Sequence, residues 1–109
     1  MQEFHIIGIT DSRELSFSKE VQALIARSHV FSGGKRHHEI MAAMLPESSV
    51  WIDITVPLDA VFKCYADYQE IVVFASGDPL FFGFANTVMR KLPEAVVKVY
   101  PSFNSLPLL

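Results

Sequence analysis

Short apolar runs and segments of helical spacing alternate along this 109-residue chain. Runs rich in Val, Ile and Phe predict five strands, at residues 4–9, 28–32, 50–54, 70–74 and 96–100. Apolar residues that recur every three or four positions predict four helices between them, at residues 17–27, 35–45, 58–65 and 80–92. The run that follows Glu70 is uninterrupted and β-branched, which is typical of a strand buried on both faces.

Each connection between predicted strands is long enough for a crossover helix, because the strands begin roughly 20 to 25 residues apart. Parallel strands need such crossovers, whereas an antiparallel pair needs only a short turn. The chain is also long enough for one hydrophobic core and too short for two. The sequence therefore predicts one α/β domain over residues 1–109, a mostly parallel five-stranded sheet with helices on both faces.

Composition narrows the possible functions. Half of the residues are apolar and 19% are charged, which excludes a disordered chain. The net charge of −3 argues against a nucleic-acid partner, and the basic cluster at 35–38 is too small to reverse that. No apolar stretch reaches the roughly 18 residues of a membrane span, so no membrane partner is predicted. A single cysteine, Cys64, excludes an internal disulfide and predicts a cytoplasmic location, with the thiol half-buried in packing.

Four segments at predicted strand ends carry the candidate chemistry. They are Gly8-Ile9-Thr10-Asp11, Gly33-Gly34-Lys35-Arg36, Ser76-Gly77-Asp78-Pro79 and Pro101-Ser102-Phe103-Asn104-Ser105. Because the carboxyl ends of parallel strands meet at one edge of a sheet, all four are expected where α/β sheets bind their ligands. Glycine lets the backbone approach a ligand closely, and the polar side chains can bond its hydroxyl or amino groups. Taken singly, each segment is most simply a turn, a hinge or a helix cap, so only their shared position favours a binding site.

The histidines do not predict a metal centre. His37 and His38 are adjacent, so on a helix their side chains point about 100° apart, and a solvated helix face is expected. No cysteine or carboxylate is spaced to complete a ligand set. His5 and His29 fall in apolar strands and are predicted to be structural residues with satisfied ring nitrogens. The chain also lacks a Gly-x-Ser-x-Gly elbow, a Walker loop and a Gly-x-Gly-x-x-Gly fingerprint, and no catalytic residue is assigned.

Four stretches, in order along the chain, resemble the tetrapyrrole (corrin/porphyrin) methylases, which use S-adenosylmethionine. They are residues 6–9, 30–37, 75–83 and 101–106. The second contains a stretch similar to the Gly-Gly-x-Arg-His of the precorrin-6Y C5-methyltransferase branch, and the third is similar to its Ser-Gly-Asp-Pro-Leu-Phe-Tyr-Gly. The chain departs from the family at Thr10 and Ser102, where glycine is usual, and at Asn104, where serine or threonine is usual.

The resemblance implies an S-adenosylmethionine-dependent methyltransferase that acts on a precorrin ring carbon in cobalamin biosynthesis. It implies two α/β domains with the methyl donor between them, of which residues 1–109 form the N-terminal one and the C-terminal one is absent. Arg36 and His37 are then expected to lie toward the acidic precorrin or cobalt-precorrin substrate. The donor site is expected to contain Gly8, Thr10, Ser76, Gly77, Asp78, Asn104 and Ser105. The sulfonium already activates the methyl group, so no general base is expected.

The alternative function is a non-enzymatic α/β module that binds a nucleotide-like ligand or a partner protein. A chain with half of the cleft is expected to bind the donor weakly and to catalyse nothing alone. It is also expected to expose the apolar surface that a second domain covers, which favours a homodimer. Continuation of the parent protein with a second α/β half distinguishes the two functions.

Overall fold

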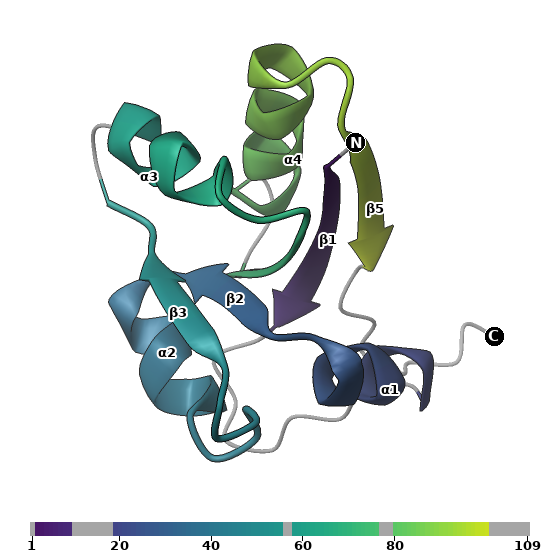
Figure 1. Cartoon of the computed structure of the whole chain (residues 1–109), viewed down its shortest axis with the longest axis vertical. Helices are drawn as coiled ribbons and strands as arrows, with labels where there is room; N and C mark the ends of the chain where they lie inside the picture. The colour runs from purple at the N-terminus through teal and green to yellow at the C-terminus, as the bar shows by residue number, and fades with distance from the viewer. Residues whose placement is uncertain (1, 10–18, 56–57, 77–79, 101–109) are drawn as a thin grey trace, which may run out of the picture.

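The computed structural model of the chain describes residues 2–9, 19–55, 58–76 and 80–100. Strands and helices alternate along these residues, as the hydrophobic pattern predicts (Figure 1). The strands are β1 (Glu3–Ile9), β2 (Val30–Gly33), β3 (Val50–Asp53), β4 (Glu70–Ser76) and β5 (Val96–Tyr100). The helices are α1 (Lys19–Arg27), α2 (Lys35–Met41), α3 (Leu58–Tyr65) and α4 (Leu80–Lys91). Residues 17 and 18, which the pattern places in the first helix, lie outside the described residues.

The strands form one five-stranded parallel sheet in the order β3-β2-β4-β1-β5, which confirms the predicted α/β fold. β4 is central and pairs with β1 along its whole length, from Glu3↔Glu70 to Ile9↔Ser76. β2 pairs with β4 on the other side, and β3 and β5 form the outer strands. Residues 71–75 of β4 are all buried, so this strand is covered on both faces as its apolar run predicts.

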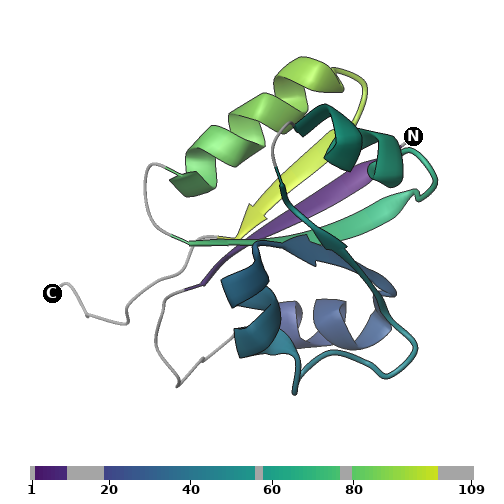
Figure 2. The ribbon, with the colours of Figure 1, turned by 90° about the vertical axis from the view of Figure 1, so that its left-hand side faces the viewer.

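Two helices cover each face of the sheet (Figure 2). The first core cluster lies under α3 and α4, and its helical members are Val61, Tyr65, Ala85 and Val88. The second lies under α1 and α2, and its helical members are Val21, Leu24, Ile25 and Met41. Burial of each Val, Leu or Ile side chain contributes about 1.5–3 kcal/mol relative to exposure. The two clusters therefore fix the sheet between its helical layers.

A buried pair of hydroxyl groups fastens α3 to the sheet. The hydroxyl of the fully buried Tyr65 lies 2.7 Å from Ser32 Oγ on β2. Ser32 donates its own hydroxyl proton to the Ile52 carbonyl of β3 at 2.7 Å, so Tyr65 is the donor to Ser32. Burial raises the pKa of Tyr65 to about 12, and the residue remains a neutral donor near neutral pH.

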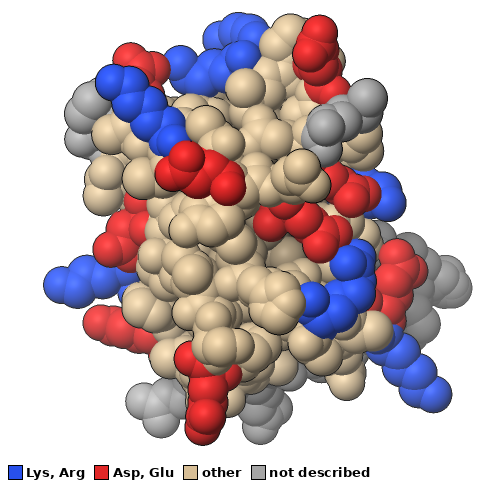
Figure 3. Space-filling view, in the orientation of Figure 1, with Lys and Arg blue, Asp and Glu red and all other residues tan. Residues whose placement is uncertain are grey.

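Charged side chains of both signs are dispersed over one face of the molecule (Figure 3). On the face drawn in Figure 3, Lys and Arg lie scattered among Asp and Glu and do not gather into one basic patch. Within the described part of the chain, no helix combines the length and the apolar content needed to cross a bilayer.

The boundary between α1 and β2 differs from the prediction. The run 28–32 predicts a strand from Ser28, whereas β2 begins at Val30. The Ser28 hydroxyl donates to the Leu24 carbonyl at 2.6 Å, and its amide donates to the Ile25 carbonyl at 3.3 Å. Ser28 therefore closes the end of α1 instead of joining the sheet. His29 is exposed before β2, so its prediction as a structural strand residue is wrong.

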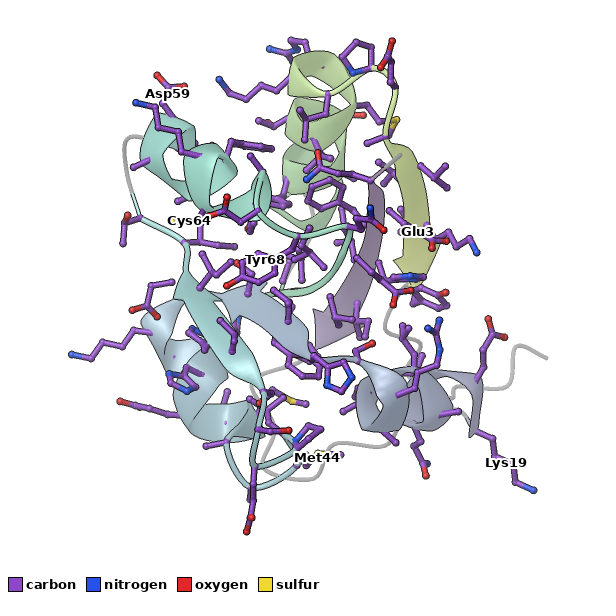
Figure 4. The ribbon with its side chains drawn as sticks, viewed as in Figure 1. Glu3, Lys19, Met44, Asp59, Cys64 and Tyr68 are labelled. Carbon is purple, nitrogen blue, oxygen red and sulfur yellow. The ribbon has the colours of Figure 1, made fainter. Side chains whose placement is uncertain are left out.

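Two further side chains lie in solvent where packing was predicted (Figure 4). α2 ends at Met41 and not at Leu45, because the Met44 amide donates to the Met41 carbonyl at 2.8 Å in a tight turn. This turn leaves Met44 42% exposed and off the apolar side of the helix. Cys64 is also exposed, because it precedes the buried Tyr65 by one position and therefore points about 100° away from the core.

Candidate functional site

At the carboxyl end of β4, the helices that follow neighbouring strands lie on different faces of the sheet. The helices that follow β1 and β2, which are α1 and α2, lie on one face of the sheet, while α4 follows β4 on the other face (Figure 2). β4 has β1 on one side and β2 on the other. The helix that follows β4 therefore lies on the opposite face from the helices that follow its two neighbours, β1 and β2. Parallel α/β sheets bind ligands in the crevice that such a divergence opens at the carboxyl ends of the strands.

Two predicted site residues lie beside this divergence. Gly8 of β1 is paired with Ala75 of β4, and the next pair is Ile9↔Ser76. Gly8 and Ser76 therefore stand on adjacent strands, one register position apart. Gly8 is buried inside the strand ladder and is not a turn residue. Glycine in general lets a ligand approach the backbone closely, which is the role predicted for Gly8.

The end of β2 is shaped by a tryptophan from the neighbouring strand. A Cβ atom at Gly33 would lie 3.1 Å from Trp51 Cζ2 and Cη2, and 3.2 Å from the Phe74 carbonyl oxygen. A side chain at Gly33 would therefore press on Trp51 and on the backbone of β4, so the interpretation of Gly33 as a simple hinge into the second helix is incomplete. Gly34 precedes α2 with φ −72° and ψ 165°, which any residue adopts, and a Cβ there meets nothing closer than 3.8 Å.

The first turn of α2 carries the residues predicted to face an acidic substrate. Arg36 is exposed and His37 is half-buried. The His38 ring stacks on the Trp51 indole, with 4.3 Å between ring centroids and 9° between planes. The solvated face expected for the histidine pair is therefore wrong, because β3 supplies an aromatic partner that a local pattern does not show. Trp51 is itself oriented by a 2.8 Å hydrogen bond from its Nε1 to Asp53.

The remaining donor-site residues are Thr10, Gly77, Asp78, Asn104 and Ser105, and they lie outside the described residues. Their assignments stay predictions. The structure brings together Gly8 and Ser76 at the ends of β1 and β4, and it places Gly33 and Arg36 at the end of β2.

A second polar cluster, not predicted from the sequence, occupies the opposite edge of the sheet. Glu3, His5 and Glu70 have side-chain ligand atoms within 4.8 Å of one another. His5 Nε2 lies 2.9 Å from Glu70 Oε2, and His5 Nδ1 lies 3.2 Å from the Tyr100 hydroxyl. His5 is 1% exposed, which confirms its prediction as a satisfied structural histidine. The alternation of Glu3 and His5 on one face of β1 is visible in the sequence, but the register with Glu70 is not.

Cations already neutralise both carboxylates of this cluster. Arg27 Nη1 lies 3.2 Å from each Glu70 oxygen, and Lys98 Nζ lies 3.0 Å from Glu3 Oε2. The hydrogen bond from Lys98 holds the pKa of Glu3 below its usual value, and the same bond raises the pKa of Lys98. A metal ion would have to displace these partners. The cluster therefore stabilises the amino ends of β1 and β4 through ion pairs and hydrogen bonds.

A hollow of about 260 Å³ lies elsewhere, lined by Gln2, Lys91, Leu92, Pro93, Glu94 and Ala95. The Gln2 amide nitrogen already donates to the carbonyls of Tyr65 and Tyr68, at 2.8 and 3.0 Å. This hollow lies where α4 ends and β5 begins, and so it is not at the carboxyl end of β4, where the helices diverge. The carboxyl edge around β4 is the stronger candidate.

Comparison with known proteins identifies a relative. The chain is 34% identical over 106 residues to the precorrin-6Y C(5,15)-methyltransferase [decarboxylating] of Sinorhizobium sp.. The match covers 94% of this chain and 25% of the relative, so the chain spans about a quarter of the length of that protein. No protein-family model matches the chain, and no solved structure does. The chain is thus a distant homologue of this methyltransferase over the matched quarter, in agreement with the resemblance carried by its motifs.

Proposed function

We propose that this chain supplies the methyl-donor side of a methyltransferase that acts on a precorrin ring carbon in cobalamin biosynthesis. The observation that carries the proposal is the 34% identity, over nearly the whole chain, to a precorrin-6Y methyltransferase. The divergence of helices on both sides of β4 supports it, because this topology forms ligand crevices in α/β sheets. Such a biosynthetic enzyme would work in the cytoplasm.

The proposed role of the carboxyl edge is to bind and align S-adenosylmethionine. The sulfonium of S-adenosylmethionine supplies a methyl group that is already activated for transfer. The protein then has to orient the donor against an electron-rich ring carbon and to exclude water. Gly8 and Ser76, with Thr10, Gly77, Asp78, Asn104 and Ser105, are the residues we assign to donor binding. No residue of the chain is assigned as a general base.

The substrate side of the proposal rests on the first turn of α2. Precorrins carry several carboxylates, and the exposed Arg36 can bind one of them in a charge-assisted, bidentate manner. His37 adds a second polar group on the same turn. The chain covers a quarter of its relative, so we expect it to bind the donor and to transfer no methyl group by itself.

Calorimetric titration of S-adenosylhomocysteine, the product of methyl donation, into the 109-residue chain tests the proposal. We expect binding with a Kd below roughly 1 mM, weakened at least about tenfold by Asp78→Ala, since a lost charge-assisted hydrogen bond has that effect. Asp67→Ala is the matched control, because Asp67 is an exposed carboxylate in the turn after α3. Heat of binding that is absent, or unchanged in the Asp78 variant, contradicts the proposed donor site.

The short match also supports a second function, a non-enzymatic module that binds a ligand or a partner. A protein of this kind would bind S-adenosylhomocysteine and the methylated and unmethylated tetrapyrrole equally, because it need not distinguish reactant from product. It would also form a homodimer, which sedimentation analysis detects.

A further inference from the structure

Four aromatic rings form a column on the face of the sheet that α1 and α2 cover. Phe31 of β2 lies 6.0 Å from Phe74 of β4, and Phe74 lies 6.1 Å from Trp51 of β3, measured between ring centroids. His38 of α2 stacks on Trp51 at 4.3 Å. All three pairs have interplanar angles of 9°. The column thus runs from the buried centre of the sheet to the surface of a helix.

Gly33 makes this column possible. Trp51 is on β3 and Phe74 is on β4, and β2 lies between them in the sheet. The indole of Trp51 crosses β2 at Gly33, where a Cβ would lie 3.1 Å from two ring atoms. The indole is consequently held by the backbone of β2, by the Phe74 ring and by the hydrogen bond to Asp53. It offers His38 a rigid surface.

The first turn of α2 lacks two common local stabilising features, a side-chain cap and an acidic residue. The helix has seven residues, and Gly34 at its N-cap makes no side-chain capping bond. Its first turn holds no acidic residue, while Lys35 and Arg36 place positive charge at the positive end of the helix dipole. Short helices of this kind form mainly through tertiary packing. The buried Met41 supplies such packing at the end of the helix, and the stack of His38 on Trp51 supplies it two positions after Arg36.

The geometry points to His38 and Trp51 as positioning residues that hold Arg36 at the carboxyl edge of the sheet for a carboxylate-bearing tetrapyrrole. This inference rests on the proposed function and adds to it the element that fixes the substrate-facing turn. His38 acts through the helix backbone and not through contact with the substrate. When α2 is less firmly packed, Arg36 binds a carboxylate less tightly, because ordering a mobile guanidinium costs free energy.

Uroporphyrin, a porphyrin with eight carboxylates, is the probe for the test. Trp51 is the chain's single tryptophan, so quenching of its fluorescence reports binding close to the stack. We expect His38→Ala to weaken uroporphyrin binding about three- to tenfold, the worth of a lost aromatic stack, and His38→Phe to restore it within about twofold. His29→Ala is the control, because His29 is exposed and precedes β2. The affinity for S-adenosylhomocysteine should not change in any of these variants.

A double-mutant cycle separates positioning from a general loss of stability. If His38 acts through Arg36, then His38→Ala costs little further affinity once Arg36→Ala is present, and the two losses are not additive. Additive losses, or full affinity in His38→Ala, overturn the inference and leave the proposed donor site standing. Binding of S-adenosylhomocysteine without uroporphyrin also overturns the inference alone. A chain that binds neither ligand overturns the proposed function and this inference together.

Discussion

At the amino edge of the sheet, where β1 and β4 begin, the side chains of Glu3, His5 and Glu70 are bound to one another and to the flanking cations. At the carboxyl edge, the same two strands end at Ile9, which follows Gly8, and at Ser76, and the helices that follow the two strands lie on opposite faces of the sheet (Figure 2). The first edge has the dense cluster of titratable groups, yet its groups are already satisfied. The second combines small residues with this divergence of the helices.

This contrast distinguishes a polar cluster that stabilises the fold from an edge of the sheet that can bind a ligand. A buried histidine with partners on both ring nitrogens, such as His5, stabilises the strands that carry it and has no site left for a ligand. A ligand site in an α/β sheet instead needs backbone that is free to be approached and helices that leave room. The number of titratable residues favours the amino edge, whereas the topology favours the carboxyl edge, where we propose the ligand site.

The largest expected effect comes from the amino edge. His5→Ala removes a buried ring and, with it, the hydrogen bonds that the ring makes with Glu70 and with Tyr100. We expect the substitution to lower the free energy of unfolding by about 2–4 kcal/mol. Urea denaturation measures the change, with His29→Ala as a control within about 0.5 kcal/mol of wild type. At temperatures below the unfolding transition of the variant, its affinity for S-adenosylhomocysteine should equal that of wild type. A strong loss of affinity in the folded variant would place the ligand at the wrong edge for this account.

At the carboxyl edge, Gly33→Ala is expected to lower the free energy of unfolding by about 1–3 kcal/mol. The added Cβ would lie 3.1 Å from Trp51 and 3.2 Å from the Phe74 carbonyl oxygen, so the indole and the backbone of β4 would have to shift. Gly34→Ala is the matched control at the next position, and we expect it to be near neutral because 3.8 Å is an ordinary contact. Equal effects from the two substitutions would show that Trp51 does not occupy the notch over Gly33.

A smaller effect is expected from pH at the Glu3–Lys98 pair. The Lys98 hydrogen bond lowers the pKa of Glu3 from 4.5, so the pair stabilises the fold above that value and loses its effect as pH falls through the lowered pKa. The pKa of Lys98 is raised from 10.5, so the alkaline loss begins only above that value. We therefore expect Lys98→Gln to be less stable than wild type at about pH 6, with a smaller difference at about pH 3.

Urea denaturation at both pH values measures this difference, with Lys19→Gln as a control for an exposed lysine. Because Lys98 is itself largely in water, the effect is the weakest of the three. A Lys98→Gln difference that is just as large at low pH would assign the effect to packing of the lysine stem and not to its charge.

Local pattern predicts the elements of this fold well because each strand is a continuous apolar run and each helix has a regular apolar side. The apolar run after Glu70 identifies the central strand, and the helix Leu58–Tyr65 and the strand Val96–Tyr100 have the predicted bounds. The errors occur where a hydrogen bond delays the start of an element or ends it before its pattern does. Ser28 bonds back to α1, and Met44 bonds back to Met41.

The candidate site is harder to predict, because its contacts join residues distant in sequence. The glycines at strand ends are visible in the chain, and so is the expectation that they share an edge. That Gly33 lies under Trp51, and that His38 stacks on the same ring, depends on the order of β2 and β3 in the sheet. The bond between His5 and Glu70 likewise depends on the register of β1 with β4.

The central claim is that the methyl donor binds at the carboxyl edge, and amide chemical-shift mapping with S-adenosylhomocysteine tests it most directly. The account predicts concentration-dependent shifts at the Gly8, Ile9, Ala75 and Ser76 amides. It predicts little change at Glu3, His5 and Glu70, which lie at the far ends of the same two strands. Shifts centred on the amino edge, or no shifts at either edge, would contradict the account.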